Sequence, residues 1–212
     1  MKAFRTFIGG VLAGISIAVG GTVFLSLDNK VLGALFFTVG LFAVCTFGFN
    51  LYTGKVCYVF DRDKSYALSL PLIWLGNLAG AFLTAAAERA TRIGPALAEK
   101  AQTICTLKLN DGLLSIFFLS VLCNILIWLA VEGFNNNPHT AGKYLSLIFG
   151  VTVFILCGFE HCVANMYYFS VAGMWSWKTL GWVLIMTLGN SVGGFLFPLL
   201  RKLAAGKPDK AA

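Results

Sequence analysis

Long apolar segments alternate with short polar connections along the whole chain. An α-helix needs about 20 mostly apolar residues to cross a bilayer. Six segments reach that length: 4–27, 31–60, 67–88, 112–131, 144–172 and 176–200. Strands of a membrane barrel would be short runs of alternating polarity, whereas these runs are continuous. The pattern therefore predicts an all-α polytopic membrane protein with six transmembrane helices.

The composition supports this class of protein. Of 212 residues, 58% are hydrophobic and 12% are charged, which leaves too little polar surface for a soluble domain of this length. The first apolar segment follows a basic start, as in a signal peptide, but it is too long and further spans follow it. We therefore expect it to be retained as the first helix. The net charge of +7 lies largely in the connections and tails without a basic–aromatic stripe, so we expect no nucleic-acid partner.

Six spans place both termini on one side of the membrane, and the basic residues indicate which side. Nine flank the spans on the side of the termini: Lys2, Arg5, Arg62, Lys64, Lys143, Arg201, Lys202, Lys207 and Lys210. Five flank them on the opposite side: Lys30, Arg89, Arg92, Lys100 and Lys178. Lys55 and Lys108 are left out of the count as candidates for intramembrane positions. The excess favours cytoplasmic termini.

The two halves of the chain share a sequence pattern. WLGNLAGAFL at 74–83 is matched by TLGNSVGGFL at 187–196. VLAGISI at 11–17 is matched by VLCNILI at 121–127, and GFN at 48–50 by GFE at 158–160, in the same order and at nearly the same spacing. These matches predict a repeat of three helices, and because three is odd, the second copy must enter the membrane from the opposite face. The predicted organisation is one membrane domain at 1–212: repeat one at about 4–90, repeat two at about 108–203, and a short basic tail at 204–212.

Two of the apolar segments are too long for straight spans. Segments 31–60 and 144–172 each have about 30 residues, and each contains an interruption, GFNLYTG and GFEHCVAN. We expect both helices to break there, which leaves backbone groups that only a cavity or neighbouring protein can satisfy. Broken helices line the substrate path in transporters built from inverted repeats. The two breaks are therefore the candidates for the centre of a pore.

Polar side chains lie at and near these breaks, where hydrocarbon would penalise them. Glu160 and Lys108 are compatible with an ion pair that staples two helices, with the lining of a path, or with both. His161 is the better candidate for the path, because imidazole titrates near physiological pH and can donate, accept or release a proton. Thr53 can donate to an anion or cap a turn.

Other polar and reactive residues have simpler interpretations. Asn77 and Asn190 occupy equivalent positions in the two repeats and are expected to hydrogen-bond between helices. Six cysteines form no CxxC pair and are expected to be small buried residues: Cys45, Cys57, Cys105, Cys123, Cys157 and Cys162. We expect no metal site and no cofactor, because the paired ligand spacing of a metal cluster is missing.

The motifs at these residues resemble those of the formate/nitrite transporter family over nearly the whole chain. GFEHCVANMYY is similar to the family's helix-five motif, NLYTG to its helix-two loop, CNILIWLA to its fourth helix and LGNSVGGFLF to its sixth. The resemblance implies a homopentamer in a bacterial plasma membrane. Each protomer would have an aquaporin-like fold and its own pore for small monovalent anions. The compact chain looks closest to the hydrosulfide-channel branch of the family.

The same resemblance implies roles for ten residues. His161 corresponds to the central pore histidine and Thr53 to its partner from the helix-two loop. A polar set lies near the outer part of the path: Lys108, Asn124, Glu160 and Asn190. Hydrophobic constrictions are expected at four positions: Phe37, Leu41, Leu51 and Phe154. Asn50 departs from the pattern, because the family often has an acidic residue there, and the N-terminal segment is too short for the usual amphipathic leading helix, which argues against pH gating by such a helix.

We therefore expect passive or proton-linked passage of a small weak-acid anion rather than an enzymatic reaction. Hydrosulfide (HS⁻) is the leading substrate, with formate, nitrite and chloride as others. One alternative is a membrane-embedded redox enzyme that uses the cysteines and His161. Another is a structural membrane subunit stapled by Glu160 and Lys108. Conduction of water or glycerol is disfavoured by the basic path.

Overall fold

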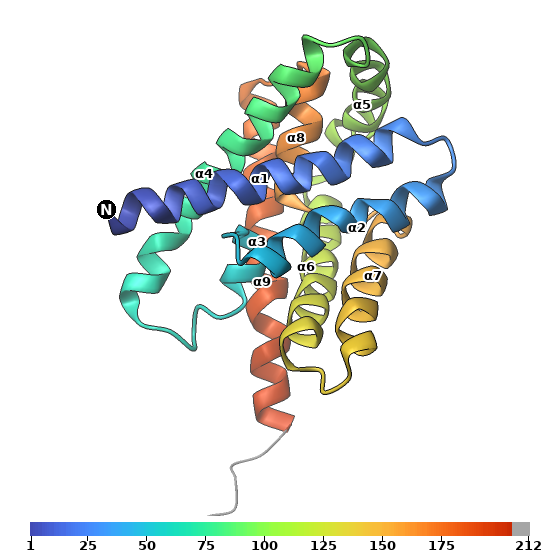
Figure 1. Cartoon of the computed structure of the whole chain (residues 1–212). Coiled ribbons are helices and arrows are strands. Elements are labelled where there is room, and N and C mark those ends of the chain that lie inside the picture. The colour runs from blue at the N-terminus through green and yellow to red at the C-terminus, as the bar shows by residue number, and fades with distance from the viewer. Residues whose placement is uncertain (205–212) are drawn as a thin grey trace, which may run out of the picture.

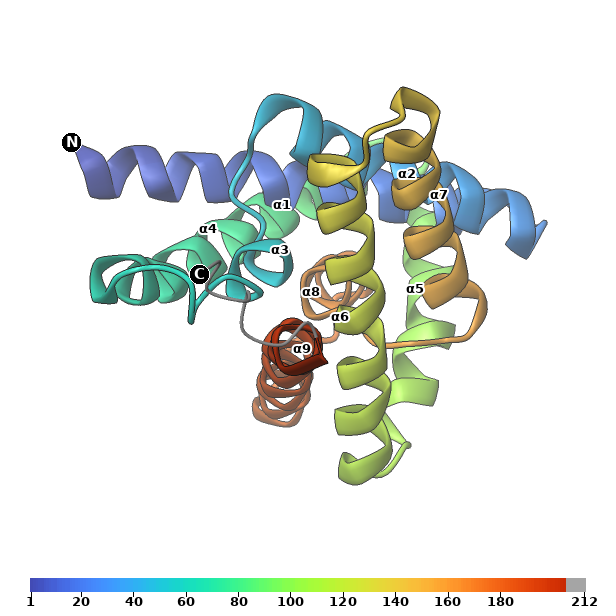
Figure 2. The same cartoon turned by 90° about the horizontal axis from the view of Figure 1, so that it is seen from below.

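A computed structural model of the chain describes residues 1–204, and this part is helical throughout apart from short connections (Figures 1 and 2). The helices are α1 (Lys2–Ser26), α2 (Lys30–Phe47), α3 (Tyr52–Val56), α4 (Lys64–Arg89), α5 (Gly94–Leu109), α6 (Leu113–Asn136), α7 (Thr140–Leu156), α8 (Cys162–Ala172) and α9 (Trp177–Ala204). Beyond Ala204, the predicted tail with Lys207 and Lys210 lies outside the described residues. Five of these helices, α1, α2, α4, α6 and α9, are long and apolar enough to cross a membrane. The predicted all-α membrane class is thus confirmed.

The predicted breaks are present in both long apolar segments. Gly48 ends α2 with φ of 70°, and Gly158 follows α7 with φ of 72°. This left-handed conformation favours glycine and turns the chain out of a helix. In both turns the next residue donates back into the helix that ends there: Phe49 N–H to the Val44 carbonyl oxygen (3.0 Å) and Phe159 N–H to that of Phe154 (2.9 Å). The chain then restarts as α3 and α8.

The two halves of the molecule make matching contacts. A Cβ atom added at Gly80 on α4 would meet the Val11 carbonyl oxygen of α1. A Cβ atom added at Gly193 on α9 would meet the Val121 carbonyl oxygen of α6. The two glycines lie at matched positions of the sequence repeat, and so do the two valines, so close helix approach through a missing side chain is built twice. These contacts agree with the expected repeats, whose limits stay a prediction.

One helix was not predicted from the hydropathy pattern. The connection between the third and fourth spans, which contains Cys105 and Lys108, forms the 16-residue helix α5. Several of its side chains are exposed, among them Glu99 and Thr103. The segment therefore lacks the continuous apolar character by which the spans were recognised. It matters for the site, because α5 packs beside α8 and places Lys108 at the second break.

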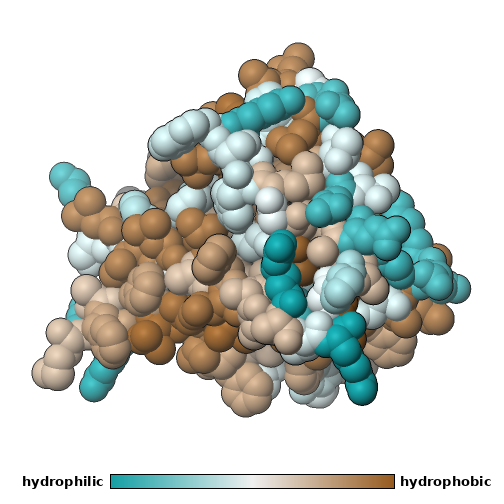
Figure 3. Space-filling view, turned by 90° about the horizontal axis from the view of Figure 1, so that it is seen from above, coloured by the Kyte–Doolittle hydropathy of each residue, from teal (hydrophilic) through white to brown (hydrophobic). Residues whose placement is uncertain are grey.

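Burial and exposed surface show what the long helices enclose and what they leave outside. All eleven residues of α8 are buried, and Figure 2 shows this helix inside the ring of longer ones. In Figure 3, seen from above, hydrophobic side chains form a broad area on the left, and hydrophilic ones gather on the right. Large exposed apolar side chains on α1 and α4 include Phe4, Ile8, Leu12, Val19, Leu68, Leu75, Phe82 and Leu83. Such a surface fits a lipid or protein neighbour rather than water.

Candidate functional site

The two breaks meet at a buried pair of side chains, Thr53 on α3 and His161 at the start of α8. Thr53 Oγ1 lies 2.9 Å from His161 Nε2, and their exposed fractions are 0% and 2%. His161 Nδ1 accepts from the Ala164 backbone N–H (3.1 Å), so this ring nitrogen carries no proton. In the neutral ring the proton is therefore on Nε2, which donates to Thr53. The hydroxyl proton of Thr53 is then left for another acceptor.

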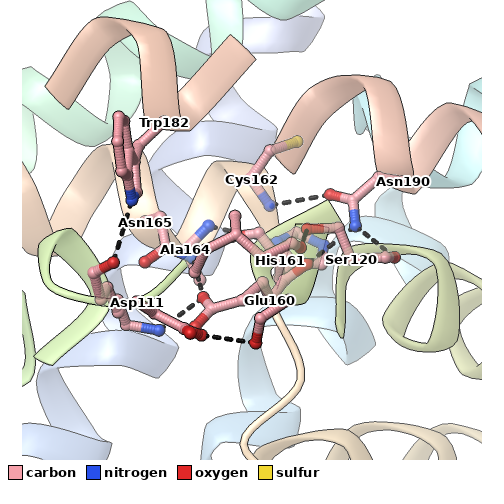
Figure 4. A network of polar contacts seen from close by, with 12 residues as sticks. Asp111, Ser120, Glu160, His161, Cys162, Ala164, Asn165, Trp182 and Asn190 are labelled. Atoms are coloured by element: carbon pink, nitrogen blue, oxygen red, sulfur yellow. Dashed lines mark hydrogen bonds and ion pairs between the residues drawn. The ribbon is translucent and has the colours of Figure 1, made fainter. Parts of the chain in front are cut away.

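A buried amide holds the second break open (Figure 4). Asn190 Oδ1 accepts from the Cys162 backbone N–H (2.8 Å). Its Nδ2 donates to the carbonyl oxygens of Ser120 (2.8 Å) and Glu160 (2.8 Å). Asn190 is fully buried, at 0% exposure, so in the described chain it contacts the backbone of the break and of the neighbouring helix α6 and does not line the two cavities described below.

Asn77 does the same at the first break. Its Oδ1 accepts from the Tyr52 backbone N–H (2.8 Å). Its Nδ2 donates to the carbonyl oxygens of Gly10 (2.8 Å) and Asn50 (2.9 Å). Because a broken helix leaves backbone groups without intrahelical partners, a buried amide that bonds to two of them, and to a carbonyl oxygen of the neighbouring helix α1, allows the break to exist inside the membrane.

Beside the second break lies the ion pair that was considered from the sequence. Lys108 Nζ is 2.5 Å from Glu160 Oε2, and the side chains are only 14% and 5% exposed. Asn165 Nδ2 donates to the same carboxylate oxygen (2.8 Å). Trp182 Nε1–H donates to the Lys108 carbonyl oxygen (2.9 Å) and fixes the end of α5. The carboxylate is thus compensated by one cation and one neutral donor.

Two cavities adjoin this site at opposite ends of α2, one lined by Lys30 and His161 and the other by Leu41 and Gly54. The first, which we call the α5-side cavity, has a volume of about 290 Å³. Its lining includes Lys108, Phe154, Glu160 and His161. The second, which we call the α3-side cavity, has a volume of about 400 Å³. Its lining includes Leu41, Leu51, Gly54, Lys55 and Arg62.

Apolar side chains pack beside the polar pair and along the α3-side cavity. The Phe37 and Phe154 rings meet edge to face, with centroids 6.1 Å apart. Phe154 also stacks on the His161 ring at 5.7 Å. Leu41 and Leu51, each 1% exposed, stand on the α3 side. Of the four residues expected as constrictions, Phe154 therefore lies against His161, Leu41 and Leu51 line the α3-side cavity, and Phe37 packs on Phe154.

Asn124 was expected in the outer polar set and lies instead at the backbone of the first break. Its Nδ2 donates to the Thr53 carbonyl oxygen (3.1 Å). Within residues 1–204, Asn124 Oδ1 and Asn165 Oδ1 are buried without a hydrogen-bond partner. Sequence reasoning assigned no role to Asn165 or Lys55. These two residues occupy equivalent positions in the two repeats, a signal that could have drawn attention to both.

Comparison with known proteins identifies the family of the chain. Residues 1–203 match the family model described as Formate/nitrite transporter. The chain belongs to the formate/nitrite transporter family. A relative in this family, the uncharacterized transporter YrhG of Bacillus subtilis, is 31% identical over 199 residues, which is 86% of this chain and 74% of the relative. The nitrite transporter NirC of Escherichia coli is 26% identical over 215 residues, with 90% and 80% covered.

A solved structure of the same family has the same fold. The structure titled "Pentameric formate channel with formate bound" superposes with a TM-score of 0.79 at 25% identity, over 96% of this chain and 97% of the other. Family membership makes this chain a multi-pass membrane transporter or channel and not an enzyme. The redox-enzyme alternative from the sequence is therefore wrong.

Proposed function

We propose that each chain forms a pore for small monovalent anions. The path runs from the α3-side cavity past Leu41 and Leu51, along Thr53 and His161, and into the α5-side cavity. One observation carries the proposal: a fully buried pair of hydrogen-bonding side chains lies beside two cavities at opposite ends of α2, and each cavity is lined by at least one lysine. An intramembrane polar centre between two cationic cavities favours an anion over a cation or a neutral solute.

The chemistry of passage follows from the two donors at the centre. The apolar constrictions remove water from the anion, which is costly for a bare charge. The Thr53 hydroxyl, whose proton is not used by His161, offsets part of this penalty by donating to the anion. The imidazole N–H orients the Thr53 hydroxyl for this contact, and a positive charge on the ring would make the hydrogen bonding at the centre charge-assisted. His161 can also give its proton to the anion, so that the neutral acid crosses the narrowest part and the proton is released afterwards.

The remaining expectations concern the assembly and the membrane. We propose a homopentamer, which is supported by the pentameric formate channel of the same fold and by the broad apolar surface of Figure 3. The excess of Lys and Arg on the side of the termini favours a bacterial plasma membrane orientation with cytoplasmic termini. The chain would then be a single membrane domain of two inverted repeats.

Hydrosulfide is our leading substrate, with formate, nitrite and chloride as others. The hydrosulfide proposal is supported by the resemblance of the compact chain to that branch of the family. Formate and nitrite are supported by the names of the relatives. All are small monovalent anions, and three of them are conjugate bases of weak acids, to which a central imidazole could return a proton.

The test is anion flux into proteoliposomes that contain purified protein. Hydrosulfide, formate, nitrite and chloride are compared for the wild type, Thr53→Val and His161→Asn. The matched control is His139→Asn, since His139 is the other histidine and lies exposed at the start of α7. We expect flux to fall by about tenfold or more in both central variants and to stay unchanged in the control.

Each outcome has a clear consequence. The rank order in the wild type names the substrate, and formate or nitrite above hydrosulfide would contradict the hydrosulfide proposal. The absence of flux in a well-folded wild type would favour the structural-subunit alternative. Flux of water or glycerol without anions would favour a neutral-solute channel.

A further inference from the structure

Within residues 1–204, the α3-side cavity contains cations that form no ion pair with a carboxylate. Lys55 and Arg62 both line it, and neither forms an ion pair within the described chain. The carboxylate in the lining, Glu132, is already engaged: Arg201 Nη1 lies 2.8 Å from its Oε1, and the Tyr58 hydroxyl donates to its Oε2 (3.0 Å). The free positive charge of this cavity therefore exceeds its negative charge.

In the α5-side cavity, by contrast, both lysines already have partners. There Lys108 is held by Glu160, with Nζ 2.5 Å from Oε2. The second lysine of that lining, Lys30, is exposed and donates to the Leu156 carbonyl oxygen (3.2 Å). An anion that enters the α5-side cavity must compete with Glu160 for Lys108. In the α3-side cavity it meets no such competitor at Lys55.

The repeat explains why Lys55 forms no ion pair within the described chain. In the register that matches GFN with GFE, Lys55 corresponds to Asn165 and Asn50 to Glu160. In the second break the carboxylate of Glu160 lies against Asn165. In the first break the equivalent side chain is the neutral amide of Asn50, which donates to the Thr6 carbonyl oxygen (3.2 Å). The repeat that carries the lysine thus lacks the carboxylate that would neutralise it.

Hydrogen bonds hold the backbone of Lys55 in place and leave its ammonium group available for an anion. Its carbonyl oxygen accepts from the Tyr66 hydroxyl (2.7 Å) and from Tyr58 N–H (3.2 Å). Its own N–H donates to the Leu51 carbonyl oxygen (2.9 Å). With the backbone held, only the flexible stem has to be ordered when an anion binds. The volume of about 400 Å³ admits a small anion together with several waters.

We infer that the α3-side cavity is a second anion-binding site, in which Lys55, assisted by Arg62, binds the permeant anion on the side of the Leu41–Leu51 constriction opposite to Lys108. This inference rests on the proposed anion pore. It adds a position on the path at which the anion binds before or after it passes the centre. Because the charges are partly solvated, they act by raising the local anion concentration. Their effect should be strongest at low substrate concentration and low ionic strength.

The cavity contains its own probe, because Cys45 lines it and is partly exposed. The cysteine thiolate attacks a methanethiosulfonate reagent at its alkylthio sulfur. The S–SO2 bond breaks, a mixed disulfide forms and methanesulfinate leaves. An anionic and a cationic reagent of similar size are compared on purified protein, with modification of Cys45 followed by mass spectrometry. The background carries Cys157→Ser, since Cys157 is the exposed cysteine. The ratio of the two rates cancels any change in the reactivity of the thiol itself.

We expect Lys55→Gln to lower the ratio of anionic to cationic rates by about fivefold or more. Arg62→Gln should lower it less, because Arg62 is more exposed. Lys64→Gln is the matched control, an exposed lysine at the start of α4 that does not line the cavity, and should leave the ratio unchanged. An unchanged ratio in Lys55→Gln that elutes as the wild type does would overturn the inference.

Flux measurements separate this inference from the proposed function. In proteoliposomes, Lys55→Gln should raise the half-saturating anion concentration by about threefold or more at low salt, with little change in the maximal rate. His161→Asn should lower the rate at every concentration. No flux in the wild type would refute the pore itself, whatever the thiol ratio. A lowered thiol ratio with an unchanged half-saturating concentration would refute the assignment of the site to the permeant anion.

Discussion

The two breaks at the centre of the molecule have the same backbone and different side chains. Each follows a glycine with φ near 70°, and each is held by one asparagine that makes three hydrogen bonds to the backbone. Even the partners correspond, since Gly10, Asn50 and Tyr52 in the first repeat match Ser120, Glu160 and Cys162 in the second. The scaffold of the site is therefore duplicated down to individual hydrogen bonds.

The chemistry on this scaffold is divided between the copies. The first break supplies the hydroxyl of Thr53 and the free cation of Lys55. The second supplies the imidazole of His161 and the carboxylate of Glu160, which is held by α5. The central polar pair forms only because the copies face each other. A duplicated backbone thus produces an asymmetric path, and the following changes test which features belong to both copies and which to one.

The largest expected effect comes from the two amides. Asn77→Leu and Asn190→Leu each leave one carbonyl oxygen and one N–H of a break buried without partners and remove a third hydrogen bond to a neighbouring helix, so each should lower the free energy of unfolding by about 4 kcal/mol. Denaturant unfolding of the purified protein measures this. Asn110→Leu, at an exposed amide, should change it by less than about 0.5 kcal/mol. Markedly unequal losses at Asn77 and Asn190 would show that the breaks are not energetically equivalent.

The second prediction compares how much Lys108 and Lys55 contribute to stability. Lys108→Met leaves Glu160 buried without its cation, and the free energy of unfolding should fall by about 3 kcal/mol. Lys55→Met removes no ion pair within the described chain and should change it by less than about 0.5 kcal/mol. The double variant Lys108→Met/Glu160→Gln should recover at least half of the loss, because no buried charge remains. Equal losses for the two single lysine variants would contradict the division of charge described above.

Much of this architecture could be predicted from the sequence, because the signals are local. The excess length of two apolar segments, together with Gly48 and Gly158, is sufficient to place the breaks. The ion pair between Lys108 and Glu160 was also foreseen as one possibility, since an intramembrane charge needs a partner. The helical form of α5 was not foreseen, because a half-exposed helix with charged residues has no span-like pattern.

The direction of side chains at the centre could not be predicted. Asn124 and Asn190 were expected near the path, yet both bond to the backbone of the breaks. Polarity in an apolar segment indicates that a side chain needs partners, but not whether these are backbone groups or a passing anion. That choice depends on how α6 and α9 approach the breaks, which is a property of the packed structure. Lys55 was overlooked for the same reason, since its freedom depends on where Glu132 and Asn50 point.

The smallest expected effect concerns the turns themselves. Gly48→Ala and Gly158→Ala add a Cβ atom that meets nothing within 4 Å, so only the backbone conformation resists the change. Each should lower the free energy of unfolding by about 1 kcal/mol. Gly181→Ala is the matched control in α9, where the added Cβ atom also meets nothing within 4 Å and alanine favours the helix, so stability should be unchanged or higher.

The two turn variants also test whether the breaks have the same role in anion flux. Gly48 lines the α3-side cavity and Gly158 the α5-side cavity, and neither contributes a side chain to the path. If the breaks serve as equivalent scaffolds, both variants should lose the same small amount of stability and keep most of the anion flux. A selective loss of flux in one of them, at equal stability, would show that this turn moves during passage. The backbone of the two breaks would then differ in function, although it is the same in structure.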